Sequence, residues 1–557
     1  MRFTILQAFC LALYALDSAW DISAAEAQLG KTTLIGSDIP LLKGEFFGGI
    51  PYAEPPVGPL RLARPVPKFS LGNLSTFDAA NFGDSCLQLL SPFANLPMSE
   101  DCLTINLFRP AGLSPRASLP VMAWIFGGSF FTGTTITFNA SALVAQSITR
   151  GTPIIYLSFN YRLGPLGFPQ GPEAEKRGVL NLGLRDQTLA LEWVQANIAA
   201  FGGDPAKVTV FGQSAGAVSV GLLYLNHNFA NLARAAIFES GQAGTTAVFD
   251  SNRSFPQWLV FVNNTASCRG NFSVDNTFPC LLAATSDEIL AGDTAGIAAM
   301  AGEFPFFPVL DGPQGIIPAL PSQRLRSGAG GRIPFISGSV IDDGTLFVAA
   351  SIAINSTAQI VDQLNSSFTP SIPSPGGVAS LERAIDILLD LYPNIPALGC
   401  PFGTGNDTFG ISPVFKRAAA IAGDLVIQAP RRFWSQVASS QGTKVFSYIF
   451  TDPQPENPPF LGVAHTDELP YVYGQITVAA NGTGPGTLSK MMQDYWISFA
   501  TSLDPNDGKG THRPKWEAYE SQKRVLRLHS TNTEMIPDHF RCEQMAFINN
   551  NAELFAQ

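Results

Sequence analysis

The sequence contains few charged residues, and acidic ones outnumber basic ones. Asp, Glu, Lys and Arg make up 14% of the 557 residues, compared with about 25% in an average globular protein. The formal net charge is −10 and no run of like charges occurs, which excludes a nucleic-acid partner because such partners require clustered cations. A surface with so little charge needs another source of solubility, and glycans can supply it.

Sequence motifs for cofactors and metals are also missing. The chain has no P-loop, no dinucleotide-binding glycine fingerprint, no H-E-x-x-H and no C-x-x-C pair. We therefore expect neither a cofactor nor a metal. Beyond the N-terminal segment, no apolar run reaches the roughly 18 residues of a membrane-spanning helix, so we expect no membrane anchor.

The N-terminus has the pattern of a secretory signal peptide. Met1 and Arg2 supply a positive start, residues 3–16 are mostly apolar but too few to span a bilayer, and Ala25-Glu26-Ala27 fits an A-x-A cleavage site. A buried N-terminal helix is the alternative interpretation. We predict a signal peptide over residues 1–27, a single α/β domain over residues 28–557, and a soluble extracellular product.

Cysteines and glycosylation sequons agree with an oxidising compartment. Six cysteines follow the predicted signal peptide. Short loops favour the pairs Cys86–Cys102 and Cys268–Cys280, which leaves Cys400–Cys542 by elimination. Nine N-x-S/T sequons are glycosylation candidates in a secreted chain: Asn73, Asn139, Asn252, Asn263, Asn271, Asn355, Asn365, Asn406 and Asn481.

Strand-like and helix-like segments alternate along the chain. Buried strands are predicted at residues 119–126, 152–159, 207–211, 233–238, 333–337 and 444–450, and helices at residues 182–201 and 217–224. Residues 365–377 and 453–459 are predicted surface loops. The alternation indicates an α/β fold with a mostly parallel central sheet and helices on both faces.

Residues 212–216, with the sequence GQSAG, lie between a predicted strand and a predicted helix. A G-x-S-x-G in that context is typical of a nucleophile elbow, whose glycines allow a strained turn that exposes the serine hydroxyl. The N-terminus of the helix then directs free N–H groups at the reacting atoms. The pattern predicts a serine hydrolase with Ser214 as the nucleophile.

A serine nucleophile needs a base, and histidine suits that role near neutral pH. His227 lies near the far end of the elbow helix, which carries it away from Ser214. His465 follows the last predicted strand, where the histidine comes in the chain order serine, acid, histidine. The other three lie in polar segments typical of the surface: His512, His529 and His539.

Two further segments are candidates for the acid and for the oxyanion donors. Asp342 and Asp343 follow a predicted strand and compete for the acid on chemistry alone, while a solvated turn is the structural alternative for either. Residues 127–128 are glycines after another strand, where backbone N–H groups can approach a substrate closely. The N–H of Ala215 is the expected partner donor.

The chain resembles the type-B carboxylesterase and lipase family, which includes cholinesterases and fungal lipases of the Candida rugosa type. The shared motifs are the elbow and residues 49–56 (GIPYAEPP), 99–106 (SEDCLTIN), 160–164 (NYRLG) and 202–205 (GGDP). The resemblance implies an α/β-hydrolase fold and hydrolysis of a small-molecule or lipid ester through an acyl-enzyme. It also implies the site residues: Ser214, His465 and Asp343 as the catalytic triad, and Gly128, Ser129 and Ala215 as oxyanion donors.

Three positions depart from the family's pattern. Asp343 stands where glutamate is usual, so the acid is one methylene shorter, and Asp342 stays open as an alternative. Ser129 stands at the third glycine of the family's Gly-Gly-Gly, where its backbone N–H can serve if its φ is allowed. Gln213 stands where glutamate is common, which removes a charge beside the nucleophile.

The segment between the first two cysteines indicates the type of substrate. In lipases similar to this chain it forms a long lid, whereas here it comprises only the 15 residues 87–101. We therefore expect weak or absent interfacial activation and a partly open apolar gorge that favours short- to medium-chain or bulky esters. One alternative is a lipase or sterol esterase that acts on long-chain esters. Another is a non-catalytic adhesion module of the same fold.

Overall fold

The structure, a computed structural model, describes residues 25–88, 96–298, 306–330, 332–349, 354–371, 376–478, 483–520 and 522–557. Most of the predicted signal peptide lies outside these ranges, as do residues 89–95 of the predicted lid and the sequon at Asn481. Glu26 and Ala27, at the end of the predicted signal peptide, belong to β1 (Glu26–Leu29). This strand pairs antiparallel with β2 (Thr32–Ile35).

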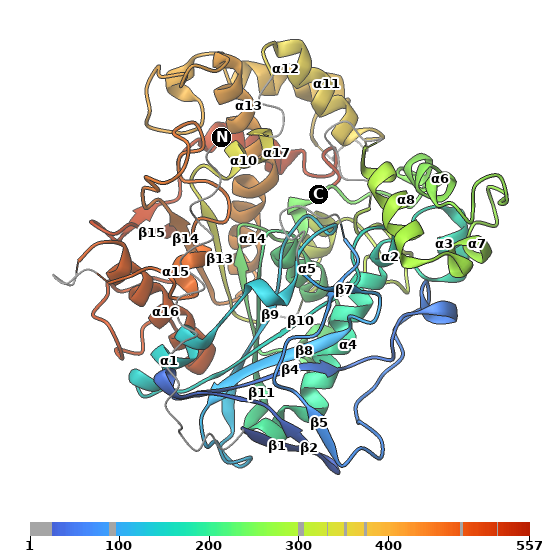
Figure 1. The fold of residues 1–557 in the computed structure, drawn as a ribbon. Helices are drawn as coiled ribbons and strands as arrows, with labels where there is room; N and C mark the ends of the chain where they lie inside the picture. The colour runs from blue at the N-terminus through green and yellow to red at the C-terminus, as the bar shows by residue number, and fades with distance from the viewer. Residues whose placement is uncertain are drawn as a thin grey trace.

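An 11-stranded mixed sheet forms the centre of the molecule (Figure 1). Its outer strands are antiparallel: β3 (Ser37–Ile39), β4 (Gly44–Pro51) and β8 (Thr104–Pro110) at one edge and β16 (Glu534–Pro537) at the other. The central strands are parallel, in the order β10 (Ile155–Phe159), β9 (Leu119–Ile125), β11 (Gly203–Gln213), β12 (Ala235–Glu239), β13 (Phe335–Val340), β14 (Val445–Phe450) and β15 (Arg524–Leu528). The predicted mostly parallel central sheet is confirmed.

Helices cover both faces of this sheet (Figure 1). α4 (Leu182–Asn197) and α5 (Ala215–Tyr224) pack on β11 and on each other, while α1 (Ser141–Thr149) packs with α16 (Pro485–Ser502). Because helices shield both faces, β10, β12 and β14 are buried along their whole length. The same burial explains why these strands are continuous apolar runs in the sequence.

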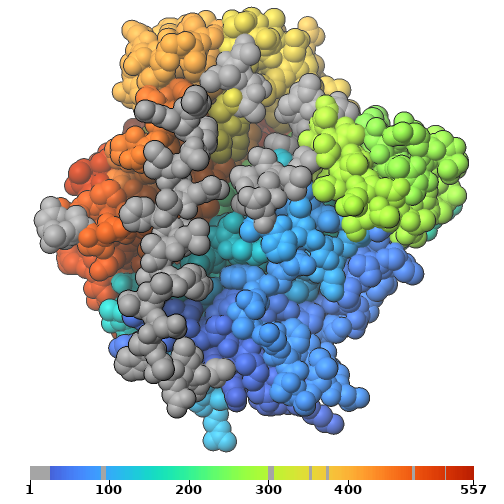
Figure 2. Space-filling view, in the orientation of Figure 1, coloured from blue at the N-terminus to red at the C-terminus, as the bar shows by residue number. Residues whose placement is uncertain are grey.

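Two helical regions extend from the sheet. The first encloses a second apolar core in the upper part of Figure 1 and contains α10 (Asp343–Ala349), α11 (Thr357–Phe368), α12 (Leu381–Leu391), α13 (Pro413–Gly423) and α17 (Cys542–Asn550). The second is a lobe at the right of Figure 2, in which α6 (Phe255–Asn264) packs on α8 (Ser286–Ala298). None of the helices in the described ranges is long and apolar enough to cross a membrane.

The prediction of a surface loop at residues 365–377 is wrong at its start, because residues 365–368 belong to α11. A capping box at Ser356 begins this helix, and Ile360, Leu364 and Phe368 bury one narrow face of it. The exposed face carries Gln359, Asp362, Asn365 and Ser366, so the segment resembles a polar loop when it is judged by composition.

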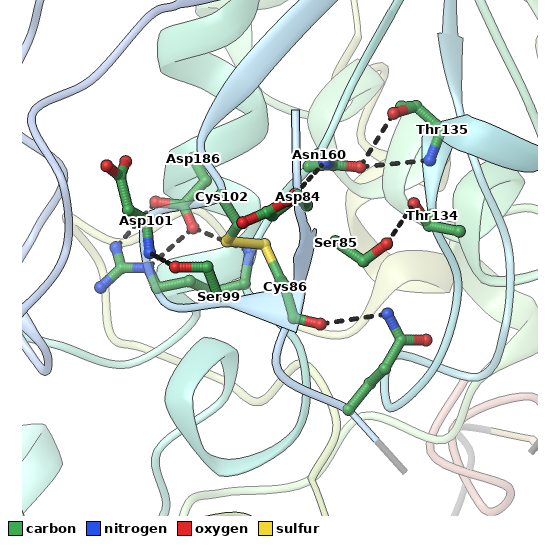
Figure 3. Close-up of a disulfide and its surroundings, with 12 residues drawn as sticks. Asp84, Ser85, Cys86, Ser99, Asp101, Cys102, Thr134, Thr135, Asn160 and Asp186 are labelled. Atoms are coloured by element: carbon green, nitrogen blue, oxygen red, sulfur yellow. Dashed lines mark hydrogen bonds and ion pairs between the residues drawn. A yellow bond between two sulfur atoms is a disulfide. The ribbon is translucent and has the colours of Figure 1, made fainter. Parts of the chain in front are cut away.

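Two of the predicted disulfides are present in the structure. Cys86 bonds to Cys102 (Figure 3) and Cys268 bonds to Cys280. The first bridge is tied to the chain beyond β9 by a hydrogen bond from Ser85 Oγ to Thr134 Oγ1 at 2.9 Å, also drawn in Figure 3. The second closes a loop after α6, in the lobe of Figure 2.

The predicted third disulfide, Cys400–Cys542, is wrong. Cys400 is buried and its thiol donates to Asp342 Oδ1 at 3.3 Å, whereas Cys542 is exposed at the first turn of α17. Pairing by elimination assumed that every cysteine is oxidised. The fold instead uses Cys400 as a buried hydrogen-bond donor to a carboxylate.

A thiol count tests this difference between the sequence prediction and the structure. In the chain without its signal peptide, we expect a thiol reagent to label one cysteine, Cys542, in the folded protein and both free cysteines after unfolding in denaturant. The Cys542→Ser variant should remove the label from the folded protein. A chain that shows no reactive thiol before and after unfolding would contain the Cys400–Cys542 bond.

Candidate active site

Ser214 lies at the sharp turn between β11 and α5. Its backbone has φ 56° and ψ −129°, a strained conformation for a residue other than glycine. A Cβ at Gly216 would lie 2.0 Å from the carbonyl oxygen of Ile125, so only glycine allows this close packing. The Ser214 N–H donates to the carbonyl oxygen of Glu239 at 3.0 Å, which holds the turn against β12. The turn thus presents the serine in the manner of a nucleophile elbow.

His465 and Asp343 form a buried pair beside this turn. His465 Nδ1 lies 2.6 Å from Asp343 Oδ1, and both side chains are almost fully buried. Asp343 Oδ2 accepts hydrogen bonds from the Val340 N–H at 3.0 Å and from the Ser240 hydroxyl at 3.3 Å. Because an ionised carboxylate can only accept, Nδ1 is the donor in this contact, and Nε2 is the ring nitrogen left for another partner.

Asp342 faces away from the histidine ring and binds backbone instead. Its Oδ2 accepts from the Val463 N–H at 3.0 Å, and its Oδ1 accepts from the Phe402 N–H at 2.9 Å and from the Cys400 thiol. Burial raises the pKa of Asp342, and these hydrogen bonds act in the opposite direction. The structure therefore brings Asp343 to His465, while Asp342 holds the loop that carries His465.

The remaining histidines lie apart from the serine. Three of them are exposed at the surface: His227, His512 and His539. His529 is half-buried, with Nδ1 at 3.9 Å from Asp452 Oδ1. In the part of the chain that the structure describes, no group of three or more His, Cys, Asp or Glu side chains is arranged to hold a metal ion.

The glycine-containing turn after β9 packs directly against the elbow. A Cβ at Gly127 would lie 2.9 Å from the Cβ of Ser214. Gly128 has φ 113°, and a Cβ there would lie 2.0 Å from the Thr132 carbonyl oxygen, so this position requires glycine. Ser129 has φ 54°, in the left-handed region, which costs a non-glycine residue about 1 kcal/mol. The sequence left open whether the φ of Ser129 is allowed, and the observed value is one that serine can adopt.

Gln213 occupies the free nitrogen of the histidine. Its side-chain Nε2 lies 3.2 Å from His465 Nε2 and donates to the lone pair there. In the described part of the chain, no hydrogen bond joins the Ser214 hydroxyl to His465. The sequence indicated only that Gln213 removes a charge, and nothing in the pentapeptide predicted that its amide reaches His465.

The carboxylesterase family model matches residues 32–548 of this chain. The chain belongs to the carboxylesterase family. It is a carboxylic ester hydrolase, and the resemblance seen in its motifs is confirmed. The crystal structure of Aspergillus niger EstA superimposes with a TM-score of 0.79 at 26% identity, over 94% of this chain and 98% of that one. This agreement confirms the α/β-hydrolase fold.

Several relatives of this carboxylesterase are named lipases. Lipase 1 of Geotrichum candidum is 34% identical over 97% of this chain and 99% of its own. The secreted triacylglycerol lipase LIP1 of Gibberella zeae is 34% identical over 93% of this chain and 89% of its own. Human bile salt-activated lipase is 32% identical over 92% of this chain and 68% of its own.

In this carboxylesterase a buried glutamine links the first disulfide loop to the turn after β9. Gln88 Oε1 accepts from the Thr132 hydroxyl and from the Gly133 N–H, both at 2.8 Å. Its Nε2 donates to the carbonyl oxygens of Gly133 at 2.9 Å and of Cys86 at 3.1 Å. Gln88 thus holds the turn that carries residues 127–129. No sequence motif predicted this role, because the two segments are far apart along the chain.

The contrast between the two aspartates yields a test. We expect Asp343→Asn to lower kcat by about 10⁴-fold, because an amide no longer favours the tautomer with the proton on Nδ1. Asp342→Asn should keep most of kcat and lower the melting temperature, because an amide leaves at least one buried N–H without an acceptor. Steady-state kinetics and thermal unfolding of both variants measure these effects.

The two variants control for each other, since they are the same substitution at adjacent positions. A loss of kcat in Asp342→Asn equal to that in Asp343→Asn would move the acid role to Asp342. Near-normal turnover by a folded Asp343→Asn variant would contradict the geometry at His465.

Proposed function

We propose that this carboxylesterase uses Ser214 as the nucleophile, His465 as the general base and Asp343 as the acid that orients the histidine. The observation that carries this proposal is the 2.6 Å contact from His465 Nδ1 to Asp343 Oδ1 beside a strained serine. The contact fixes the ring and its tautomer, and it stabilises the imidazolium that forms when Ser214 loses its proton.

The reaction starts when the Ser214 hydroxyl displaces the Gln213 amide from His465 Nε2. Ser214 Oγ then attacks the ester carbonyl carbon while its proton passes to Nε2, and the proton is returned to the leaving alcohol. The backbone N–H groups of Gly128, Ser129 and Ala215 bind the oxyanion. A water molecule, activated in the same way, hydrolyses the acyl-enzyme and restores the serine.

Ser214→Ala tests the nucleophile. We expect kcat to fall by at least about 10⁴-fold, because what remains is the contribution of the oxyanion donors and of binding. The thermal unfolding curve should stay close to that of the wild type. An organophosphate should label the wild type at Ser214 and leave the variant unlabelled. Turnover near wild type in the folded variant would refute the assignment.

For the substrate, we propose short- to medium-chain or bulky carboxylic esters. The proposal is supported by the 16-residue separation of Cys86 and Cys102, which leaves little chain for a lid. A lipase that acts on long acyl chains is the second candidate, and it is favoured by relatives that are named lipases, Lipase 1 and triacylglycerol lipase among them. Both candidates use the same chemistry at Ser214 and differ in the acyl pocket.

A series of esters with increasing acyl length separates the two candidates. We expect the highest kcat/KM for short to medium chains, and a smooth rise of rate as a triglyceride passes its solubility limit. The Ser214→Ala variant is the control for non-enzymatic hydrolysis. A sharp increase at the solubility limit, together with a preference for long chains, would establish the lipase instead.

We propose that the protein is secreted and N-glycosylated. Support comes from its two disulfides and from relatives whose names include the word secreted. Every sequon asparagine that the structure describes is exposed. Because Glu26 and Ala27 lie in β1 and the Arg109 guanidinium donates to the Glu26 carbonyl oxygen at 2.8 Å, cleavage before Glu26 keeps this strand whole.

A further inference from the structure

Three buried polar side chains lie behind the His465–Asp343 pair, and the proposed reaction uses none of them. Glu239 is the last residue of β12, Tyr448 lies in β14, and Glu468 lies three residues after His465, before α15 (Leu469–Val472). All three are completely buried. A carboxyl group in such a place requires either a cation or a proton.

The sheet register places two of these groups side by side. Glu239 pairs with Gly338 on β13, and Gly338 pairs with Tyr448 on β14. A Cβ at Gly338 would lie 1.9 Å from the Tyr448 ring, so this ring lies across the glycine towards Glu239. Trp496 of α16 closes the site, with its ring 5.3 Å from that of Tyr448 and its Nε1–H donating to Glu239 Oε1 at 2.6 Å.

The remaining polar atoms of this group have no partner. Among the described residues, none forms a hydrogen bond to Glu239 Oε2, to either carboxyl oxygen of Glu468 or to the Tyr448 hydroxyl. Buried polar atoms in native proteins are almost always paired with protein or with ordered water. Unpaired atoms on three neighbouring side chains therefore indicate protons and water molecules between them.

The charges around these groups are acidic. Glu468 interacts electrostatically with Glu239, Asp343 and Asp467, and Tyr448 interacts with both glutamates. In the described ranges neither glutamate forms an ion pair with Lys, Arg or His. Glu239 also acts electrostatically on the Tyr156 and Tyr473 hydroxyl groups, whose oxygens lie 3.0 Å apart. Ionisation of both glutamates would place two further carboxylates close to Asp343 in a buried region.

We propose that Glu239 and Glu468 form an un-ionised acid pair at neutral pH, bridged with Tyr448 by buried water, and that this pair leaves the charge beside His465 to Asp343. The existence of the acid pair does not depend on the proposed function. Only its consequence for the charge beside His465 rests on the proposed roles of His465 and Asp343. In that arrangement, each protonated carboxyl group supplies an O–H donor for a neighbouring oxygen, which satisfies atoms that have no other partner.

The acid pair makes stability depend on pH in a defined direction. Burial is the largest cause that raises the pKa of Glu239, from 4.5 to about 8, and burial and the neighbouring acids raise the pKa of Glu468 as well. Between those two pH values the folded protein binds more protons than the unfolded chain. The free energy of unfolding therefore decreases as the pH rises through this range.

Glu239→Gln and Glu468→Gln test the pair, because glutamine resembles the protonated acid in shape and in having a donor and an acceptor. We expect each variant to retain kcat near neutral pH and to show a smaller fall of the melting temperature than wild type between about pH 5 and pH 8. Glu543→Gln, at an exposed position, is the matched control and should keep the wild-type pH dependence.

Infrared spectroscopy gives a readout that does not depend on ester hydrolysis or on the folding of a variant. Wild-type protein at neutral pH should show the carbonyl stretching band of an un-ionised carboxyl group, and raising the pH through about 8, the pKa of Glu239, should weaken this band. Absence of this band, or an unchanged pH dependence of stability in both folded variants, would overturn the proposal. A folded Glu468→Gln variant with kcat reduced 100-fold and KM unchanged would also overturn it, because an ionised carboxylate would then be required.

Discussion

The hydrogen bond between His465 Nδ1 and Asp343 Oδ1 is the interaction on which the rest of the site depends. It joins the turn after β13 to the loop after β14, so its 2.6 Å length is set by two parallel strands in fixed register. Asp342 reinforces this register, because its backbone N–H donates to the Val463 carbonyl oxygen while its side chain accepts the Val463 N–H. An aspartate is thereby long enough at a position where the family commonly has glutamate.

The backbone on the other side of the histidine is strained, and the core sustains it. Ser129, Phe130 and Ser214 all have positive φ, a conformation that costs on the order of 1 to 3 kcal/mol at each non-glycine position. The strain persists because buried neighbours leave no other arrangement: Gly216 packs on the Ile125 carbonyl, and Gln88 holds the turn that carries Ser129. The large buried sheet therefore stabilises a geometry that a short peptide would not keep.

Local sequence was sufficient for the fold class, for the strands of the sheet and for an aspartate next to His465, because each depends on a pattern within a few residues; the choice of Asp343 over Asp342 came from the family resemblance. It failed where the outcome depends on segments that meet only in three dimensions. Cys400 donates to Asp342 instead of bonding to Cys542, Gln88 reaches the turn after β9, and Gln213 reaches His465 Nε2. No spacing rule reports such contacts. Composition also led to the wrong prediction of a loop at residues 365–368. These residues belong to α11, which has a polar exposed face and an apolar buried face.

The charge at the site depends on which of the side chains around it are neutral. Gln213 places an uncharged amide where the family often has a carboxylate, and the proposed acid pair removes charge from Glu239 and Glu468. In the proposed mechanism the stabilisation of the imidazolium is then left to Asp343, which is held by the Val340 N–H and the Ser240 hydroxyl. Glu239 also links the two parts of the site, because its carbonyl oxygen holds the Ser214 N–H while its side chain belongs to the acid pair. In the proposed mechanism, the loss of a proton from the acid pair would therefore affect both Ser214 and His465.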